Sequence, residues 1–305
     1  KGIEIAVHAD IEDKDQTVYV PKIKTTAIGE DTKEHIEKAK EDAVIVDTVE
    51  YKGLEVGREY VMTGKLVDKV NGEVITDAEG NDIIACETFI AETEEGSIDI
   101  TFTFDSSALA GKKIVAFEDV IYEGISIGTH EDLTDEDQTI SYPEIHTTAV
   151  NGTDGSKTMV LGTNVTLVDT VTYKGLTTGK TYVLKGTIMD KASGQPIGVT
   201  AETTFTAEAS DGSAEVTFTF DTTKLQGKTL VVFETLYDTQ SNQIVDHSDL
   251  NDEDQTVSVP VQPVIPPVVT GDDSSPMLYV LGLLAALAAA VAVAAVLVRR
   301  KRKQA

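Results

Sequence analysis

The chain has one cysteine and no tryptophan among its 305 residues, and phenylalanine and tyrosine together supply only 6% of it. A single cysteine excludes an internal disulfide framework. We expect Cys86, in the segment IIACETF, to be a small buried residue on a strand rather than a nucleophile. So few aromatic residues also leave no obvious exposed aromatic patch for an adhesive binding surface.

Basic residues are scarce as well: 25 Lys and Arg stand against 52 Asp and Glu, for a net charge of −27. The bases are further concentrated in the run RRKRK at 299–303. An acidic body repels phosphate backbones and anionic lipid headgroups. We therefore expect no nucleic-acid partner and no role for the body of the chain on a membrane surface.

One long stretch, residues 277–298, carries no charge. As a helix it would be about 33 Å long, enough for a hydrocarbon core of about 30 Å. It is followed by the basic tail 299–305, so the positive-inside rule predicts a transmembrane helix with its tail in the cytoplasm and the body outside the cell. Residues 260–276 are predicted to form an extended Pro-rich linker. Because no export signal follows Lys1, we take the sequence to be part of a longer protein.

Long internal repeats divide the body. VDTVEYKGLEVGREYVMTGKLVDK at 46–69 matches VDTVTYKGLTTGKTYVLKGTIMDK at 168–191, and VHADIEDKDQTV at 7–18 matches THEDLTDEDQTI at 129–140. We predict two complete repeats, 20–141 and 142–259, preceded at 1–19 by the last strand region of a truncated repeat.

Within each repeat the apolar residues alternate, as in SIDITFTFD and SAEVTFTFD, which is typical of half-buried strands. Turn signals such as Lys-Gly-Leu recur at short spacing. We predict an all-β fold of tandem antiparallel Ig-like β-sandwich repeats, followed by the one C-terminal transmembrane helix. The weak helical pattern at 32–43 has no evident counterpart in the second repeat, so it is predicted to be a loop or a single short helix.

Both repeats carry the same ordered set of polar residues: Thr-Thr-Ala near the start, then Asp-Thr-Val, then Phe-Glu, and finally a His eight residues before a Gln. The sets are Thr25, Asp47, Glu118, His130 and Gln138, and Thr147, Asp169, Glu234, His247 and Gln255. The step from His to Gln recurs at the start of the chain, from His8 to Gln16.

Residues 17–258 resemble the T-Q ester-bond domains of VaFE-repeat surface proteins, in which a Thr of the first strand and a Gln of the last become joined by an intramolecular ester. The resemblance implies crosslinks from Thr25 to Gln138 and from Thr147 to Gln255. It implies that each domain acts once, on itself, without a cofactor, and is not an enzyme. The assisting residues would be Asp47, Glu118 and His130 in the first repeat, and Asp169, Glu234 and His247 in the second.

The chemistry independently requires such a set. A neutral Thr hydroxyl is a weak nucleophile and needs a base, for which His is the usual choice near neutral pH. A carboxamide needs a hydrogen-bond donor at its oxygen as negative charge develops there. Two carboxyls brought close in a dry interior cannot easily both ionise, and the one that stays protonated can be that donor.

Other readings stay open at individual positions. Neighbouring residues on a strand face opposite sides, so either Thr25 or Thr26, and either Thr147 or Thr148, can face the Gln; the family pattern selects the first of each pair. The acidic loop before Gln138 could be a solvated turn. A calcium site in the same loop is another alternative, but Asp132, Asp135 and Asp137 lack the spacing of an EF-hand loop, so we assign no metal ligands.

The segment PVVTG at 267–271, followed by the apolar run and the basic end, resembles a sortase cell-wall sorting signal, with Pro-Val in place of the usual Leu-Pro. The resemblance implies cleavage between Thr270 and Gly271 and attachment to the peptidoglycan of a Gram-positive cell. The chain would then be an extracellular stalk, and a host or matrix ligand would belong to an N-terminal head absent from this sequence. The alternatives are an adhesive binding module, or a pilus shaft module that uses Lys22 in VYVPK.

Overall fold

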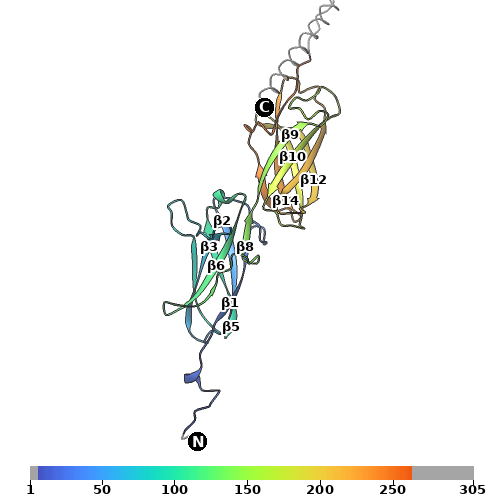
Figure 1. The fold of residues 1–305 in the computed structure, drawn as a ribbon. Helices are drawn as coiled ribbons and strands as arrows, with labels where there is room; N and C mark the ends of the chain where they lie inside the picture. Colours follow the sequence, from blue (N-terminus) through green and yellow to red (C-terminus); the bar gives the residue numbers. More distant parts are fainter. Residues whose placement is uncertain (1–5, 263–305) are drawn as a thin grey trace, which may run out of the picture. The chain divides into compact units, whose positions relative to one another are not determined.

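The computed structural model describes residues 6–262, and it contains two β-domains in succession (Figure 1). The predictions for Thr270, Gly271, the helix 277–298, the tail 299–305 and most of the linker 260–276 concern residues outside this described part. Within residues 6–262 no helix is long and apolar enough to cross a membrane. Residues 6–21 contain one short 3-10 helix, η1 (Lys14–Gln16), and no strand.

Eight strands build the first domain: β1 (Lys22–Gly29), β2 (Ala43–Lys52), β3 (Glu59–Asp68), β4 (Ile84–Ile90), β5 (Glu95–Phe104), β6 (Lys112–Tyr122), β7 (Ile125–His130) and β8 (Thr139–Tyr142). They form a three-stranded sheet in the order β1-β2-β5 and a five-stranded sheet in the order β4-β3-β6-β7, in which β8 also pairs with β6. A second 3-10 helix, η2 (Ser107–Leu109), connects the sheets.

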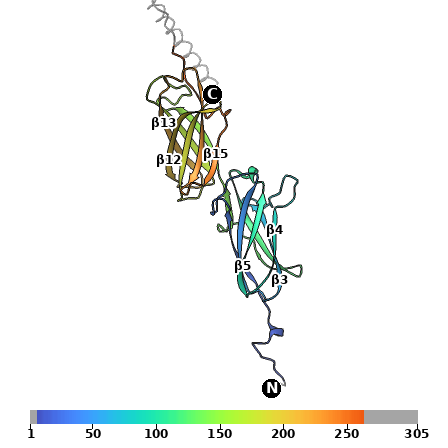
Figure 2. The ribbon, with the colours of Figure 1, turned by 180° about the vertical axis from the view of Figure 1, so that it is seen from behind.

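The second domain repeats this topology with β9 (Glu144–Asn151), β10 (Val165–Lys174), β11 (Thr181–Asp190), β12 (Gln195–Thr206), β13 (Gly212–Phe220), β14 (Thr229–Asp238), β15 (Gln243–His247) and β16 (Thr256–Ser258). Its sheets have the orders β13-β10-β9 and β12-β11-β14-β15, and β16 pairs with β14. The view from behind shows β12, β13 and β15 of this domain (Figure 2). All pairs of named strands are antiparallel.

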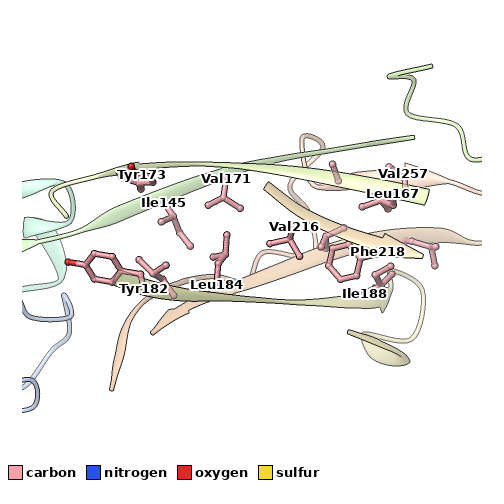
Figure 3. Packing of buried hydrophobic residues seen from close by; sticks show 14 of the residues in the cluster. Ile145, Leu167, Val171, Tyr173, Tyr182, Leu184, Ile188, Val216, Phe218 and Val257 are labelled. Carbon is pink, nitrogen blue, oxygen red and sulfur yellow. The ribbon is translucent and has the colours of Figure 1, made fainter. Parts of the chain in front are cut away.

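Each domain is a sandwich because the inward residues of its two sheets share one core. In the second domain, side chains of β9 and β10 point toward those of β11 across the interior (Figure 3). Ile145 and Val171 lie on one side, and Leu184 and Ile188 on the other. Each fully buried aliphatic side chain contributes about 1.5–3 kcal/mol, so the alternating pattern of the sequence fixes which face of each strand is inside. The prediction of tandem antiparallel β-sandwiches is confirmed.

Two local expectations were wrong. Cys86 is exposed, because it lies on the outer face of the edge strand β4, where its neighbour Ala85 takes the inward position. Residues 32–42 form a loop that leads into β2, as expected, but this loop does have a counterpart in the second domain. Ile36 forms an isolated bridge with Ser141, and Thr158 forms the equivalent bridge with Ser258. The two loops differ too much in sequence for self-comparison to align them.

Candidate functional site

The first predicted pair, Thr25 and Gln138, comes from the two different sheets of the first domain. Thr25 lies on β1, and Gln138 directly precedes β8. The backbone carbonyl of Gln138 accepts a hydrogen bond from the Ala116 N–H of β6 at 3.1 Å. Thr147 and Gln255 occupy the same positions in the second domain, with Val232 as the donor at 3.1 Å. All four side chains are buried, none more than 3% exposed.

The choice between neighbouring threonines follows from the phase of the strand. Thr25 faces the core and pairs with the buried Val49 of β2, whereas Thr26 is exposed. In the second domain Thr147 is buried and Thr148 is exposed. The structure therefore presents Thr25 and Thr147 to the interior.

Two carboxyls enter the same interior from opposite sheets. Asp47 takes an inward position on β2 between Ile45 and Val49, and Glu118 takes one on β6 between Ala116 and Val120. Both are at most 1% exposed, and their side chains interact directly. Asp169 of β10 and Glu234 of β14 do the same in the second domain, where both are fully buried.

Burial determines the protonation of these pairs. Burial and, to a lesser degree, the neighbouring Asp47 together raise the pKa of Glu118 to about 11. Burial also raises the pKa of Asp47, against the opposing effects of Glu118 and the Thr25 hydroxyl. Glu234, beside Asp169, has its pKa raised to about 11 for the same reasons. Each Glu therefore keeps its proton at neutral pH, as expected when two carboxyls share a dry site.

The glutamines lie against these protonated carboxyls. The Gln138 side-chain amide is in contact with Glu118 Oε2. In the second domain the Gln255 amide nitrogen lies 3.5 Å from Glu234 Oε2 and 3.5 Å from the carbonyl oxygen of His247. Because each Glu is protonated, turning the amide by half a turn lets its carbonyl oxygen accept a hydrogen bond from the carboxyl. The arrangement can thus polarise the carboxamide.

Several polar atoms at these sites have no hydrogen-bond partner of ordinary geometry. They are the hydroxyl oxygens of Thr25 and Thr147, both carboxyl oxygens of Asp47 and Asp169, one of Glu118 and Glu234, and the amide oxygens of Gln138 and Gln255. A buried group left unpaired costs about 1–3 kcal/mol. The same atoms are unpaired in both domains, so packing elsewhere in each domain must offset this cost.

The histidines are held by aspartates that the sequence analysis did not include in the site. His130 pairs with Glu118 across β6 and β7, and its Nε2 lies 2.9 Å from Asp135 Oδ2. His247 and Asp252 repeat the contact at 2.8 Å. Burial would raise the pKa of Asp252, but the hydrogen bond from His247 and backbone N–H groups lower it. The signal was available: the same five-residue step separates His8 from Asp13, which are also in contact.

Glycines on β3 and β11 allow close packing beside the site. A Cβ on Gly186 would lie 2.9 Å from Glu234 Oε1 and 2.4 Å from the ring of Phe218. On Gly64 it would lie 2.6 Å from the ring of Phe102. A glycine inside a strand often marks such a close approach, and this signal too was present in the sequence. Within residues 6–262, no group of three or more His, Cys, Asp and Glu side chains could hold a metal ion.

The raised pKa values predict a dependence of stability on pH. Between the ordinary value of 4.5 and about 11, the folded state binds a proton on Glu118 that the unfolded chain has released. The stability that this bound proton gives to the folded state is fully present below pH 4.5 and is lost as pH rises toward 11. We use the double variant Thr25→Val, Thr147→Val, which cannot form an ester. Its free energy of unfolding should fall as pH rises, by at most about 1.4 kcal/mol per pH unit in each domain.

Denaturant unfolding between pH 5 and pH 9 measures this slope. Adding Glu118→Gln and Glu234→Gln, which keep the shape and remove the titrating carboxyls, should reduce it. A slope of zero or of opposite sign in the double variant would show that the carboxyls ionise inside the folded domains.

Comparison with known proteins gives a family and distant structural likenesses. A family model described as "T-Q ester bond containing domain" matches the chain twice, over residues 21–142 and 143–259. No curated protein matches the chain.

Among solved structures, a bacterial adhesin from Mobiluncus mulieris is similar, described as containing intramolecular disulfide, isopeptide and ester bond cross-links. It is 16% identical, with a TM-score of 0.35, and the match covers 73% of this chain and 83% of that one. A glycosyl hydrolase family 2 member from Bacteroides cellulosilyticus is 10% identical over 44% of this chain and 16% of that one, with a TM-score of 0.29. Likenesses this distant to proteins of such different kinds carry no argument about function.

Proposed function

Since the chain belongs to the family of T-Q ester bond containing domains, we propose that each of its two domains forms one ester, from Thr25 to Gln138 and from Thr147 to Gln255, by a reaction within the domain. The observation that supports this most is the buried set of Thr, Gln, Asp and Glu, contributed by both sheets and repeated in both domains. A site closed to solvent and paired with residues of its own domain suits a reaction of the domain with itself.

The first step is attack of the Thr25 hydroxyl oxygen on the side-chain carbonyl carbon of Gln138. Burial raises the pKa of Asp47 and the Thr25 hydroxyl opposes that rise, so Asp47 interacts with this hydroxyl and is our candidate to accept its proton as the C–O bond forms. Protonated Glu118 donates a hydrogen bond to the oxygen on which negative charge develops. Such a donor contributes about 10²–10³ in rate.

The second step expels ammonia. The tetrahedral intermediate collapses, the C–N bond breaks, and the nitrogen leaves with the proton that came from the hydroxyl. The products are one ester and one ammonia, with no oxidant or cofactor. Because neither Thr nor Gln is regenerated, the domain reacts once and is not an enzyme that turns over.

His130 has a supporting place in this scheme. Sequence reasoning assigned it as the base, but its Nε2 is engaged with Asp135. We assign it to the electrostatics of the site: burial raises the pKa of Asp47, and the nearby imidazole of His130 is among the groups that oppose this rise. His247 and Asp252 take the same roles for Asp169.

For the whole chain we propose a structural stalk of immunoglobulin-like domains on a Gram-positive cell surface. An all-β body without disulfides, made of repeats with their own crosslinks, fits a part that bears shear outside the cell. The sorting-signal resemblance at 267–271 supports attachment to peptidoglycan by a sortase, with residues 277–298 holding the chain in the membrane until cleavage after Thr270. A ligand-binding head would lie upstream.

Intact mass spectrometry tests the crosslinks. The purified chain should be lighter than its sequence by two ammonia molecules. Thr25→Val and Thr147→Val should each restore the mass of one ammonia, and the double variant should restore the mass of both. Valine keeps the shape of threonine without its hydroxyl. A folded parent chain of unshifted mass would refute the esters and leave an uncrosslinked adhesive or pilus module as the better account.

A further inference from the structure

In the second domain, a cationic side chain connects β9, which carries Thr147, to the segment that carries Gln255, just before β16. The Lys157 ammonium donates a hydrogen bond to the Ala149 carbonyl at 2.8 Å and another to the Asp254 carbonyl. Ala149 lies two residues beyond Thr147 on β9, and Asp254 directly precedes Gln255. Lys157 therefore holds the backbone beside the nucleophile and the backbone beside the electrophile at once.

This bridge lies where the sheets leave a gap in their own hydrogen bonding. β9 belongs to the three-stranded sheet and β16 to the five-stranded sheet, so no ladder fixes their separation. Within the described part of the chain, residues 6–262, one backbone bond connects β9 to the segment just before β16, from the Ala149 N–H to the Asp254 carbonyl at 2.9 Å. Lys157 adds two bonds at the same point.

The first domain has a different residue at the same place. The carbonyl of Lys157 accepts from the Ser258 N–H at 2.8 Å, and the carbonyl of His35 accepts from the Ser141 N–H at 3.0 Å, which makes the two positions equivalent. His35 Nδ1 lies 2.8 Å from the Ala27 carbonyl. The imidazole thus reaches the strand of Thr25. Among residues 6–262, the Asp137 carbonyl accepts a hydrogen bond from the Ala27 N–H, at 2.9 Å, and none from His35.

Small displacements at a reacting pair have large effects on rate. A misplacement of about 1 Å can cost about 10²-fold, because attack requires the reacting atoms to be held about 3–3.5 Å apart. An ammonium that bonds two carbonyls, one on each strand, restricts this separation before any covalent bond exists.

We propose that Lys157 is a positioning residue for ester formation in the second domain, and that this domain therefore closes its ester faster than the first, in which His35 holds one strand only. The proposal rests on the crosslinking function proposed above. It assigns no contact of Lys157 with the reacting atoms.

The experiment follows both esters in one chain. Freshly synthesised full-length chain is quenched in denaturant at successive times and digested, and mass spectrometry measures the crosslinked fraction of each domain. Lys157→Met should slow closure of the second domain about 10- to 100-fold and leave the first unchanged, while Lys157→Arg, which keeps the charge and the donors, should restore most of the rate. Lys157→His should slow the second domain, and His35→Lys should speed the first.

Two controls separate the possible outcomes. In the Thr147→Val background, which forms no second ester, Lys157→Met should leave the unfolding temperature within a few degrees of its parent; a large fall there would make Lys157 merely structural and overturn the proposal. Unchanged closure rates in Lys157→Met, with both esters formed, would overturn the positioning role alone. Absence of both esters from the parent chain would overturn the proposed function, and this inference with it.

Discussion

The double variant Thr25→Val, Thr147→Val should unfold about 15–20 °C below the parent chain. An ester between the first and last strands closes a loop on the order of 100 residues, which on the loop-entropy model stabilises a domain by about 4.7 kcal/mol. For domains of this size, each kcal/mol corresponds to about 4 °C in unfolding temperature. Scanning calorimetry of both proteins at one pH measures the difference, and the single variants should show it in one transition each.

Thr25→Ser and Thr147→Ser serve as matched controls, because serine keeps the hydroxyl and loses only the methyl group. They should form esters, confirmed by mass, and keep most of the stability. If the valine variants unfold at the parent temperature although they lack the esters, the crosslinks do not stabilise the domains, and their purpose must lie elsewhere.

Glu118→Met should slow ester formation in the first domain by about 10²–10³-fold, the usual cost of removing a donor to a developing oxyanion. Methionine fills similar space without a proton to donate. The second domain, with Glu234 intact, should close normally in the same molecule and so report that synthesis and folding were unimpaired. The measurement is the crosslinked fraction of each domain over time.

Glu118→Gln is the companion variant. Its amide can still donate a hydrogen bond, so its rate should fall between those of the parent and Glu118→Met. Equal rates in the parent and Glu118→Met would exclude Glu118 as the donor and leave Asp47 as the remaining carboxyl able to fill that role.

Much of this architecture could be predicted because it depends on local sequence patterns. Alternation identified the strands, and repetition identified the two domains and the polar sets within them. The structure brings Thr25, Asp47, Glu118 and Gln138 together as expected, since each occupies an inward position of its strand. Only the phase of β1 was needed to choose Thr25 over Thr26, and the pairing of Thr25 with Val49 supplies it.

What escaped prediction depends on contacts between strands. Cys86 looked buried because its neighbours are apolar, yet burial is set by which face of an edge strand meets the core. Lys157 and His35 were not recognised because the loops that carry them share no sequence, and only their equivalent bonds to Ser258 and Ser141 show that they correspond. Asp135 and Asp252 could have been found, since their distance from the histidine is constant.

The position of the crosslinked residues also limits how far the chain could be drawn out. With both esters formed, segments 25–138 and 147–255 would be covalent rings, and a load along the chain would pass through each ester rather than around the ring. Between them only residues 139–146 could lengthen, to about 30 Å at roughly 3.4 Å per residue. Without the esters, a single unravelled domain of about 120 residues would yield on the order of 400 Å. A pulled molecule would then behave as a nearly inextensible tether, transmitting force without absorbing it by unfolding.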